Sequence, residues 1–149
     1  MTRRRLPPIL YFVVLFLAAI VISISIEGIT IIRSPLSCSG AVLAILGIVI
    51  ILWSESLFRS AGTSVRPDRK PTKLNMSGPF RYSRNPMYMG LNLILAGEAV
   101  ALGHISLLLF PLVFFIICHT LFIPEEERIL EEIFGPEYID YKKRVRRWL

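Results

Sequence analysis

The sequence predicts an all-α membrane protein with about four transmembrane helices and a cytosolic, amphipathic helical tail. The first observation is composition, because 54% of the 149 residues are hydrophobic and the mean hydropathy is +0.60, too apolar for a soluble domain of this length. The second is the length of the uncharged stretches, which is close to the ~20 residues that span a bilayer. The third is the confinement of positive charge to particular segments. We expect one membrane domain over residues 1–149.

The first two spans are predicted from stretches without charge. Residues 6–26 contain no charged side chain, and neither do residues 34–54. We therefore expect spans near residues 7–26 and 35–55. A secretory signal peptide is the alternative interpretation of the first stretch, because arginines precede it. The stretch is long for the apolar part of a signal peptide, however, and no clear cleavage site precedes Glu27.

A third apolar region, residues 85–124, is interrupted only by Glu98. This region is about twice the length of one span, so it should fold back as a hairpin of two short helices near residues 86–103 and 106–123. The reversal is predicted at Gly103, because the surrounding sequence is the least hydrophobic part and glycine tolerates the backbone of a turn.

Positive charge orients these spans. Of the 17 Lys and Arg residues, three lie in residues 1–5, seven in residues 59–84 and six in residues 128–147, which leaves Arg33 for the other side. Four spans place the three basic segments on one face, which the positive-inside rule assigns to the cytosol. We expect a multi-pass protein of the cytoplasmic membrane with both termini cytosolic.

The two cytosolic segments have different character. The loop over residues 59–85 contains Gly and Pro among its basic residues, which disfavours helix. The tail over residues 124–149 should begin a helix at Pro124, stop at Gly135 and continue as a second short helix. Trp148 beside several cations is typical of an anchor at the level of the lipid headgroups.

Residues 77–90 hold the densest group of chemically useful side chains and lead directly into the third span. Asn85 is expected to cap this helix and Pro86 to occupy its first turn. One interpretation is a helix cap with interfacial Arg and Tyr anchors. The other is an anion site, because a helix N-terminus flanked by Arg81 and Arg84 can bind a carboxylate or phosphate.

Three consecutive acids, Glu125 to Glu127, follow Pro124. They are open to interpretation as a solvated first turn, since the helix dipole favours acids there. If the last two spans form a hairpin, however, these acids meet the entrance of the third span. The result would be a pocket with cations on one wall and carboxylates on the other, suited to a zwitterionic ligand.

Two motifs follow one another along the chain. Gly78 to Gly90 reads Gly-Pro-Phe-Arg-Tyr-Ser-Arg-Asn-Pro-Met-Tyr-Met-Gly, and about forty residues later come Glu126-Glu127-Arg128 and Phe134-Gly135-Pro136-Glu137-Tyr138. Together they resemble the isoprenylcysteine carboxyl methyltransferase family, part of the phospholipid methyltransferase-like integral membrane methyltransferases. The pattern of that family is Arg-His-Pro-x-Tyr-x-Gly, a Glu-Glu pair, then Phe-Gly-x-x-Tyr-x-x-Tyr and a basic end. The resemblance covers roughly residues 58–149.

The resemblance implies S-adenosylmethionine bound at the cytosolic ends of the last two spans, with S-adenosylhomocysteine as product. It also implies a lipidic acceptor that reaches the methyl group from within the bilayer, so we expect that acceptor and membrane lipids as partners, and no nucleic acid. Carried over by position, the cofactor-binding residues are Arg84, Asn85, Pro86, Tyr88 and Gly90 on one side and Glu126 and Glu127 on the other.

The family has His where this chain has Asn85. Asn forms hydrogen bonds but does not titrate near neutral pH, so its role must be binding or orientation. A carboxylate acceptor needs no proton transfer, and alignment and water exclusion then supply most of the catalysis. An amine acceptor must lose a proton, for which Glu126 or Glu127 is the candidate base. We take Glu127 as the catalytic residue.

These features predict an S-adenosylmethionine-dependent methyltransferase that acts on a lipidic or isoprenoid-bearing acceptor, with carboxyl O-methylation first. Phospholipid or amine N-methylation and a non-catalytic lipid-binding protein are the alternatives. A nicotinamide-dependent reductase is disfavoured, since the chain has no dinucleotide fingerprint. Arg81, Glu55 and Arg144 are the predicted substrate-binding residues.

Some polar residues in the apolar regions receive weaker assignments. Glu98 is either functional or extends to the outer surface. His119 is a lesser pocket residue rather than a metal ligand, because no second His or Cys shares its face, and no metal site is expected. Cys38 and Cys118 should lie near opposite ends of different helices, so no disulfide is expected.

Overall fold

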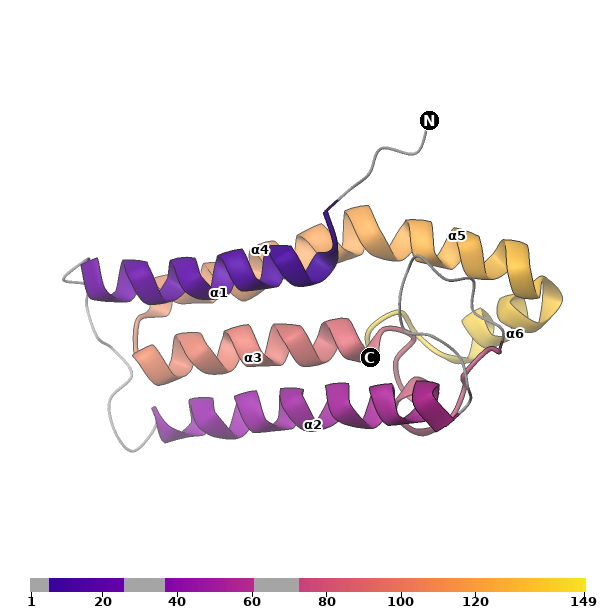
Figure 1. Ribbon diagram of the computed structural model, residues 1–149, viewed down its shortest axis with the longest axis horizontal. Helices are drawn as coiled ribbons and strands as arrows, with labels where there is room; N and C mark the ends of the chain where they lie inside the picture. Colours follow the sequence, from indigo (N-terminus) through magenta and orange to yellow (C-terminus); the bar gives the residue numbers. More distant parts are fainter. Residues whose placement is uncertain (1–5, 26–36, 61–72) are drawn as a thin grey trace.

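The structure is a computed structural model that describes residues 6–25, 37–60 and 73–149 (Figure 1). The N-terminal arginines, Arg33 and most of the basic central loop lie outside the described residues. Within the described ranges the chain is helical and has no strand, which confirms the predicted all-α class.

Four helices lie side by side, and successive helices run in opposite directions (Figure 1). The helices are α1 (Pro8–Ser25), α2 (Cys38–Ser60), α3 (Pro86–Leu102) and α4 (Leu109–Ile117); α4 continues through a π-helical turn (Cys118–Phe122) into α5 (Ile123–Phe134), and α6 (Pro136–Arg144) follows. Short 3-10 helices at Gly78–Arg81 and Ile105–Leu108 precede α3 and α4. Among the described residues, α1, α2 and the continuous segment Ile105–Phe134 are long and apolar enough to cross a membrane. The apolar α3 has 17 residues and rises about 25 Å, at the short end for a span.

The reversal between α3 and α4 lies where the sequence predicts it. Gly103 follows the last residue of α3 with a φ of 79°, in the left-handed region that favours glycine. Its N–H donates to the carbonyls of Ala99 and Val100, which closes the helix end.

Helices α2 and α3 approach each other at two pairs of glycines. A Cβ atom on Gly40 would lie 2.4 Å from the carbonyl oxygen of Gly97, and one on Gly47 would lie 2.4 Å from that of Gly90. Such distances are shorter than any real Cβ contact, so both backbones meet where only glycine fits. Lipid gives helices no hydrophobic reason to associate, and small residues instead allow extensive van der Waals contact. The beginning of α3 is therefore held firmly against α2.

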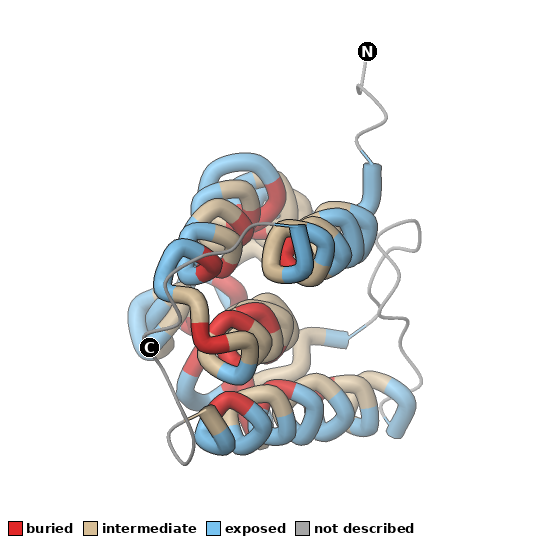
Figure 2. The backbone as a smooth tube through the Cα atoms, turned by 90° about the vertical axis from the view of Figure 1, so that its left-hand side faces the viewer, coloured by how far each residue is buried: buried red, intermediate tan, exposed pale blue. Residues whose placement is uncertain are grey.

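The core lies between α3, α4 and α1. Leu95, Phe114, Cys118 and Ile123 form its buried centre, and aromatic side chains of α1 pack against them. Figure 2 shows buried residues on the facing sides of the helices and exposed residues on their outer sides, as expected of helices whose outer surface meets lipid. Ala19 is the one fully buried residue that the described α1 contributes. Cys38 and Cys118 are both free, as expected.

The tail folds back on the segment before α3. Gly135 separates α5 from α6 with a φ of 53°, which confirms the predicted stop. In α6 the buried Tyr141 hydroxyl donates to the carbonyl oxygen of Phe80 at 2.6 Å. Beyond α6, the N–H of Arg84 donates to the carbonyl of Arg146 at 3.0 Å. The end of the chain is thereby brought beside the first motif.

Trp148 packs against the helix that carries His119, and its predicted place at the headgroup level stays a prediction. Its ring packs against Phe115 with centroids 4.6 Å apart, and its Nε1–H donates to His119 Nδ1 at 3.2 Å. The indole is turned inward because a buried N–H requires an acceptor, and the imidazole supplies one.

Candidate functional site

The two sequence motifs meet at the junction of α3 and α5. The Tyr88 hydroxyl, in the first turn of α3, donates a hydrogen bond to Glu126 Oε1 in the first turn of α5. Next to this bond, Arg84 Nη1 lies 3.2 Å from Glu127 Oε1. The predicted encounter between a wall of cations and donors and a wall of carboxylates is thus present in the structure.

Glu127 is buried and held by two arginines. Arg147 Nη2 donates to its Oε2 at 2.6 Å, and Arg147 Nε donates to its Oε1 at 3.1 Å. This hydrogen bonding raises the pKa of the Arg147 guanidinium above its usual range. Arg84 adds a second positive charge on the other side. A carboxylate that accepts a bidentate arginine has few lone pairs left for another donor, so Glu127 serves here as a partner of the two arginines.

Glu126 has the opposite character. It lies three residues beyond Ile123, the last apolar residue before the polar part of the tail. Its pKa is raised to about 7, chiefly by burial; the hydrogen bond from Tyr88 opposes the rise, and the charge of Glu127 contributes to it. A carboxyl group with a pKa near neutrality exchanges a proton readily under physiological conditions. The neighbouring acids therefore divide into one ion-paired acid and one titrating group.

Arg84 is the most unusual cation of the site. Its side chain is 10% exposed, and its Nη1 forms the ion pair with Glu127, but its Nε has no hydrogen-bond partner among the described residues. The adjacent Tyr138 is also buried, and burial raises its pKa to about 12, with the Arg84 charge acting against that rise. Buried polar atoms are nearly always paired in folded proteins, so the free Nε donor of this guanidinium indicates a place for an acceptor from outside the chain.

Asn85 and Pro86 occupy the predicted positions at the start of α3, but Asn85 does something different from what was expected. Its side chain makes no capping bond with the helix. Instead, Asn85 Nδ2 donates to the carbonyl of Arg147 at 2.9 Å, and the Ser83 hydroxyl donates to the same oxygen at 3.3 Å. The prediction of a side-chain cap is therefore wrong: the Asn85 amide is used as a donor to the Arg147 carbonyl, and its side chain forms no bond with the N–H groups of the first turn.

The remaining predicted site residues make their contacts with residues outside this cluster. Gly90 packs its backbone against Gly47. Glu55 pairs with the exposed Arg59 one helical turn along α2. Arg81 is exposed, and the exposed Arg144 donates to the backbone carbonyl of Asp140 within its own helix. Their cofactor and substrate roles stay predictions.

Three residues that complete the site were given no such role from sequence. Arg147 and Trp148 were interpreted only as part of a basic anchor, and Ser83 was not singled out. The signal for Arg147 was present in the sequence only as one cation among six in the tail. Nothing local distinguishes the cation that pairs with a buried acid 20 residues earlier.

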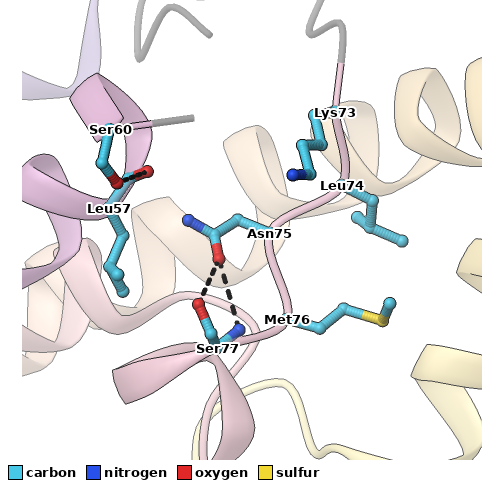
Figure 3. Close-up of a pocket in the computed structure, with 7 residues that line it drawn as sticks. All are labelled: Leu57, Ser60, Lys73, Leu74, Asn75, Met76 and Ser77. Carbon is cyan, nitrogen blue, oxygen red and sulfur yellow. Dashed lines mark hydrogen bonds between the residues drawn. The ribbon is translucent and has the colours of Figure 1, made fainter. Parts of the chain in front are cut away.

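An open hollow lies elsewhere on the surface, between the end of α2 and the segment leading to the first motif (Figure 3). Its volume is about 450 Å³, and it is lined by Leu57, Ser60, Lys73, Leu74, Asn75, Met76 and Ser77. Asn75 Oδ1 accepts from the backbone N–H and the hydroxyl of Ser77, which organises one edge. None of the predicted catalytic or cofactor residues lines it. In the part of the chain that the structure describes, no three His, Cys, Asp or Glu residues are grouped to hold a metal ion.

Comparison with known proteins agrees with the motifs. Residues 36–137, more than half of the chain, match the family described as phospholipid methyltransferase, and both motifs lie almost entirely within that range. An uncharacterized protein of Haemophilus influenzae is 41% identical over 63 residues, which are 42% of this chain and 100% of that relative. With its apolar helices and its site at their ends, the chain belongs to the phospholipid methyltransferase family of membrane methyltransferases.

Proposed function

We propose that this protein transfers a methyl group from S-adenosylmethionine to the amine of a lipidic acceptor. The observation that carries the proposal is the junction of α3 and α5, where a titrating acid, an ion-paired acid and an arginine with a free Nε donor lie together. The family as a whole uses S-adenosylmethionine, which supplies an electrophilic methyl group on a positively charged sulfur.

The side chains at the junction fit this cofactor. Its amino-acid end carries a carboxylate, and the free Nε donor and the positive charge of Arg84 suit that group. Its ammonium and sulfonium are cations, and the acids of α5 provide complementary negative charge. Tyr88 and Asn85 would complete the wall from the α3 side, as the sequence predicts.

Glu126 favours an amine over a carboxylate acceptor. An ammonium group must lose its proton before its nitrogen can attack the methyl carbon, and a buried acid with a pKa near 7 can accept that proton. A carboxylate acceptor has no such requirement and would be repelled by two neighbouring acids. This reasoning moves the base from Glu127, the residue predicted from sequence, to Glu126.

Carboxyl O-methylation of the isoprenylcysteine type is the second candidate, supported by the motif pattern. Its specific support in the structure is the excess of guanidinium charge around Glu127, which could hold an acceptor carboxylate. A non-catalytic lipid-binding protein would also bind ligands in this site, but the titrating Glu126 would then have no use.

The test begins with calorimetric titration of S-adenosylhomocysteine into the detergent-purified protein. We expect binding that is weakened at least tenfold by Tyr88→Ala and by Arg84→Ala, with Glu132→Gln, an exposed acid on α5, as the matched control. Absence of binding to the wild type would end the proposal.

The acceptor class is decided with radiolabelled methyl groups and two sets of lipids, one carrying amines and one carrying carboxylates. Base-stable label on amine lipids supports the proposal. Base-labile label on carboxyl lipids supports the second candidate instead, because methyl esters hydrolyse in base and N-methyl groups do not. Cofactor binding without turnover on either set favours the lipid-binding alternative.

We also propose that the site faces the cytosol. The free, exposed Cys38 begins α2 at the opposite end of the bundle, so it should lie on the outer side of the cytoplasmic membrane. A membrane-impermeant maleimide should then label Cys38 in intact cells. Labelling that requires disrupted cells would reverse the orientation.

A further inference from the structure

The π-helical turn between α4 and α5 contains a histidine that the proposed chemistry does not use. His119 lies in this turn, Cys118–Phe122, one residue after the buried Cys118. Wide turns of this kind are rare and occur often at functional sites, because they redirect a side chain that a regular helix would place elsewhere. The imidazole ring stacks on Phe115, with centroids 5.8 Å apart and an interplanar angle of 12°.

The polar side-chain contacts of His119 are with one short segment, residues 146–148, which we call the clasp. Trp148 Nε1–H donates to His119 Nδ1 at 3.2 Å. An indole nitrogen can only donate, so Nδ1 must be the unprotonated nitrogen of the ring. With Nδ1 as the acceptor, the ring proton lies on Nε2, so the 3.5 Å approach of Nε2 to Arg147 Nη1 brings two donors together and is a contact without a hydrogen bond. The imidazole is oriented by its stacking on Phe115 and accepts from Trp148 through Nδ1.

The clasp contacts three residues of the proposed cofactor site. Its Arg147 side chain holds Glu127, its Arg147 carbonyl accepts from Asn85, and its Arg146 carbonyl accepts from the N–H of Arg84. These are residues that the proposed function assigns to the cofactor. A ligand that reaches the free Nε donor of Arg84 therefore lies next to the clasp, which Trp148 attaches to His119.

We propose that His119 is a positioning residue of the cofactor site: by holding Trp148, it seats Arg147 on Glu127 and keeps the clasp closed against bound cofactor. The inference rests on the proposed function. His119 does not touch the reacting atoms, so it governs how long the cofactor stays bound and has little effect on the methyl transfer step itself.

Two substitutions separate the acceptor atom from the ring. His119→Asn places a carbonyl oxygen where Nδ1 lies and so keeps the acceptor, whereas His119→Phe keeps the stacking on Phe115 and removes the acceptor. A purely structural histidine in this apolar setting would tolerate Phe better than Asn. The positioning role predicts the reverse order.

The experiment uses the full chain in detergent with Trp53→Phe, which leaves Trp148 as the only tryptophan of the two in the sequence. In the absence of ligand, we expect His119→Phe to shift the Trp148 emission and increase its quenching by acrylamide, and His119→Asn to leave both close to the parent. Unchanged emission in His119→Phe overturns the inference, and so does an equal change in both variants.

The second measurement is the dissociation rate of S-adenosylhomocysteine. Loss of one hydrogen bond should accelerate dissociation about three- to tenfold in His119→Phe, with the maximal methyl transfer rate changed less than about twofold. Trp148→Phe should produce the same acceleration, and combining it with His119→Phe should add nothing. Additive effects overturn the inference. If the parent does not bind S-adenosylhomocysteine, the proposed function fails, and the emission data still decide whether His119 holds the clasp.

Discussion

The assignment of Glu126 as the base makes a quantitative prediction about pH. The carboxyl group accepts a proton only in its ionised form, and burial places its pKa at about 7. Because the pKa is raised, the ionised form is lost as the pH falls through about 7. The rate of methyl transfer to an amine should therefore fall on the acid side with a midpoint near that value.

The magnitude follows from the titration curve. At about one pH unit below the pKa, roughly a tenth of a carboxyl group is ionised, so the rate near pH 6 should be about a tenth of the plateau. Tyr88 donates to Glu126 and favours the ionised form. Tyr88→Phe removes that donor, and the midpoint should move to higher pH.

The assay measures initial rates with saturating cofactor and an amine-bearing lipid, from about pH 5.5 to about pH 9. The amine of the acceptor titrates in the same way in every variant, so its contribution cancels when a variant is divided by the wild type. Glu126→Gln should lose most activity at high pH. Its rate should show no fall at low pH beyond the fall that titration of the acceptor amine causes. Glu132→Gln, an exposed acid in the same helix, should follow the wild type throughout.

Two results would refute the reasoning. One is a ratio of Glu126→Gln to wild type that does not change with pH while activity remains high. The other is a midpoint that moves to lower pH in Tyr88→Phe, since that direction requires the tyrosine to stabilise the protonated acid.

Three further changes test the fold around the site. Glu127→Gln should lower the free energy of unfolding by about 3 kcal/mol or more, because it leaves the buried Arg84 without its countercharge; a melting temperature equal to the wild type would contradict this. Gly97→Leu should lower the free energy of unfolding by on the order of 3 kcal/mol, because even its Cβ would lie 2.4 Å from the Gly40 carbonyl oxygen. Size-exclusion chromatography in detergent should show a loss of monodisperse protein. A Leu substitution on the outward face of α3 is the control and must not produce this loss. Tyr141→Phe should lower stability by about 1 kcal/mol through its lost hydrogen bond, and a gain in thermal stability would count against that bond.

Sequence reasoning located the helices because the rules that it used are local. An uncharged stretch of about twenty residues requires an intrasegment hydrogen-bond pattern in lipid, which only a helix provides here. Gly103 and Gly135 have a positive φ, a backbone conformation that favours glycine, so the residue type itself indicates where each helix ends. The sequence and the lipid environment are therefore enough to predict these elements.

The site was predictable only in part. The hairpin logic brought Tyr88 and the acids of α5 together, and the structure does the same. The contacts of Arg147 and Trp148 could not be found in this way, because a basic end with a tryptophan has the same appearance whether it anchors in headgroups or folds inward. The distinction depends on His119 and on a carbonyl acceptor for Asn85, which lie far away in the sequence.

The glycine pairs are a second feature that could be predicted from the sequence only in part. Gly40 and Gly47 on α2 are separated by seven residues, and so are Gly90 and Gly97 on α3. That spacing places each pair on one helix face, but the sequence does not say which helices will meet. The interpretation of Gly90 as a cofactor residue shows the consequence, since its backbone faces α2.

The same glycine pairs have a consequence for how a lipid reaches the reaction. Two close contacts about 10 Å apart along the helix axes prevent α2 and α3 from either sliding or tilting relative to each other. An acceptor that arrives through the bilayer therefore cannot separate these two helices. The opposite side is different, because α1 meets its neighbours mainly through side chains and buries only Ala19 completely among its described residues. We therefore expect α2 and α3 to move as one unit, and the proposed lipid acceptor to enter on the side of α1.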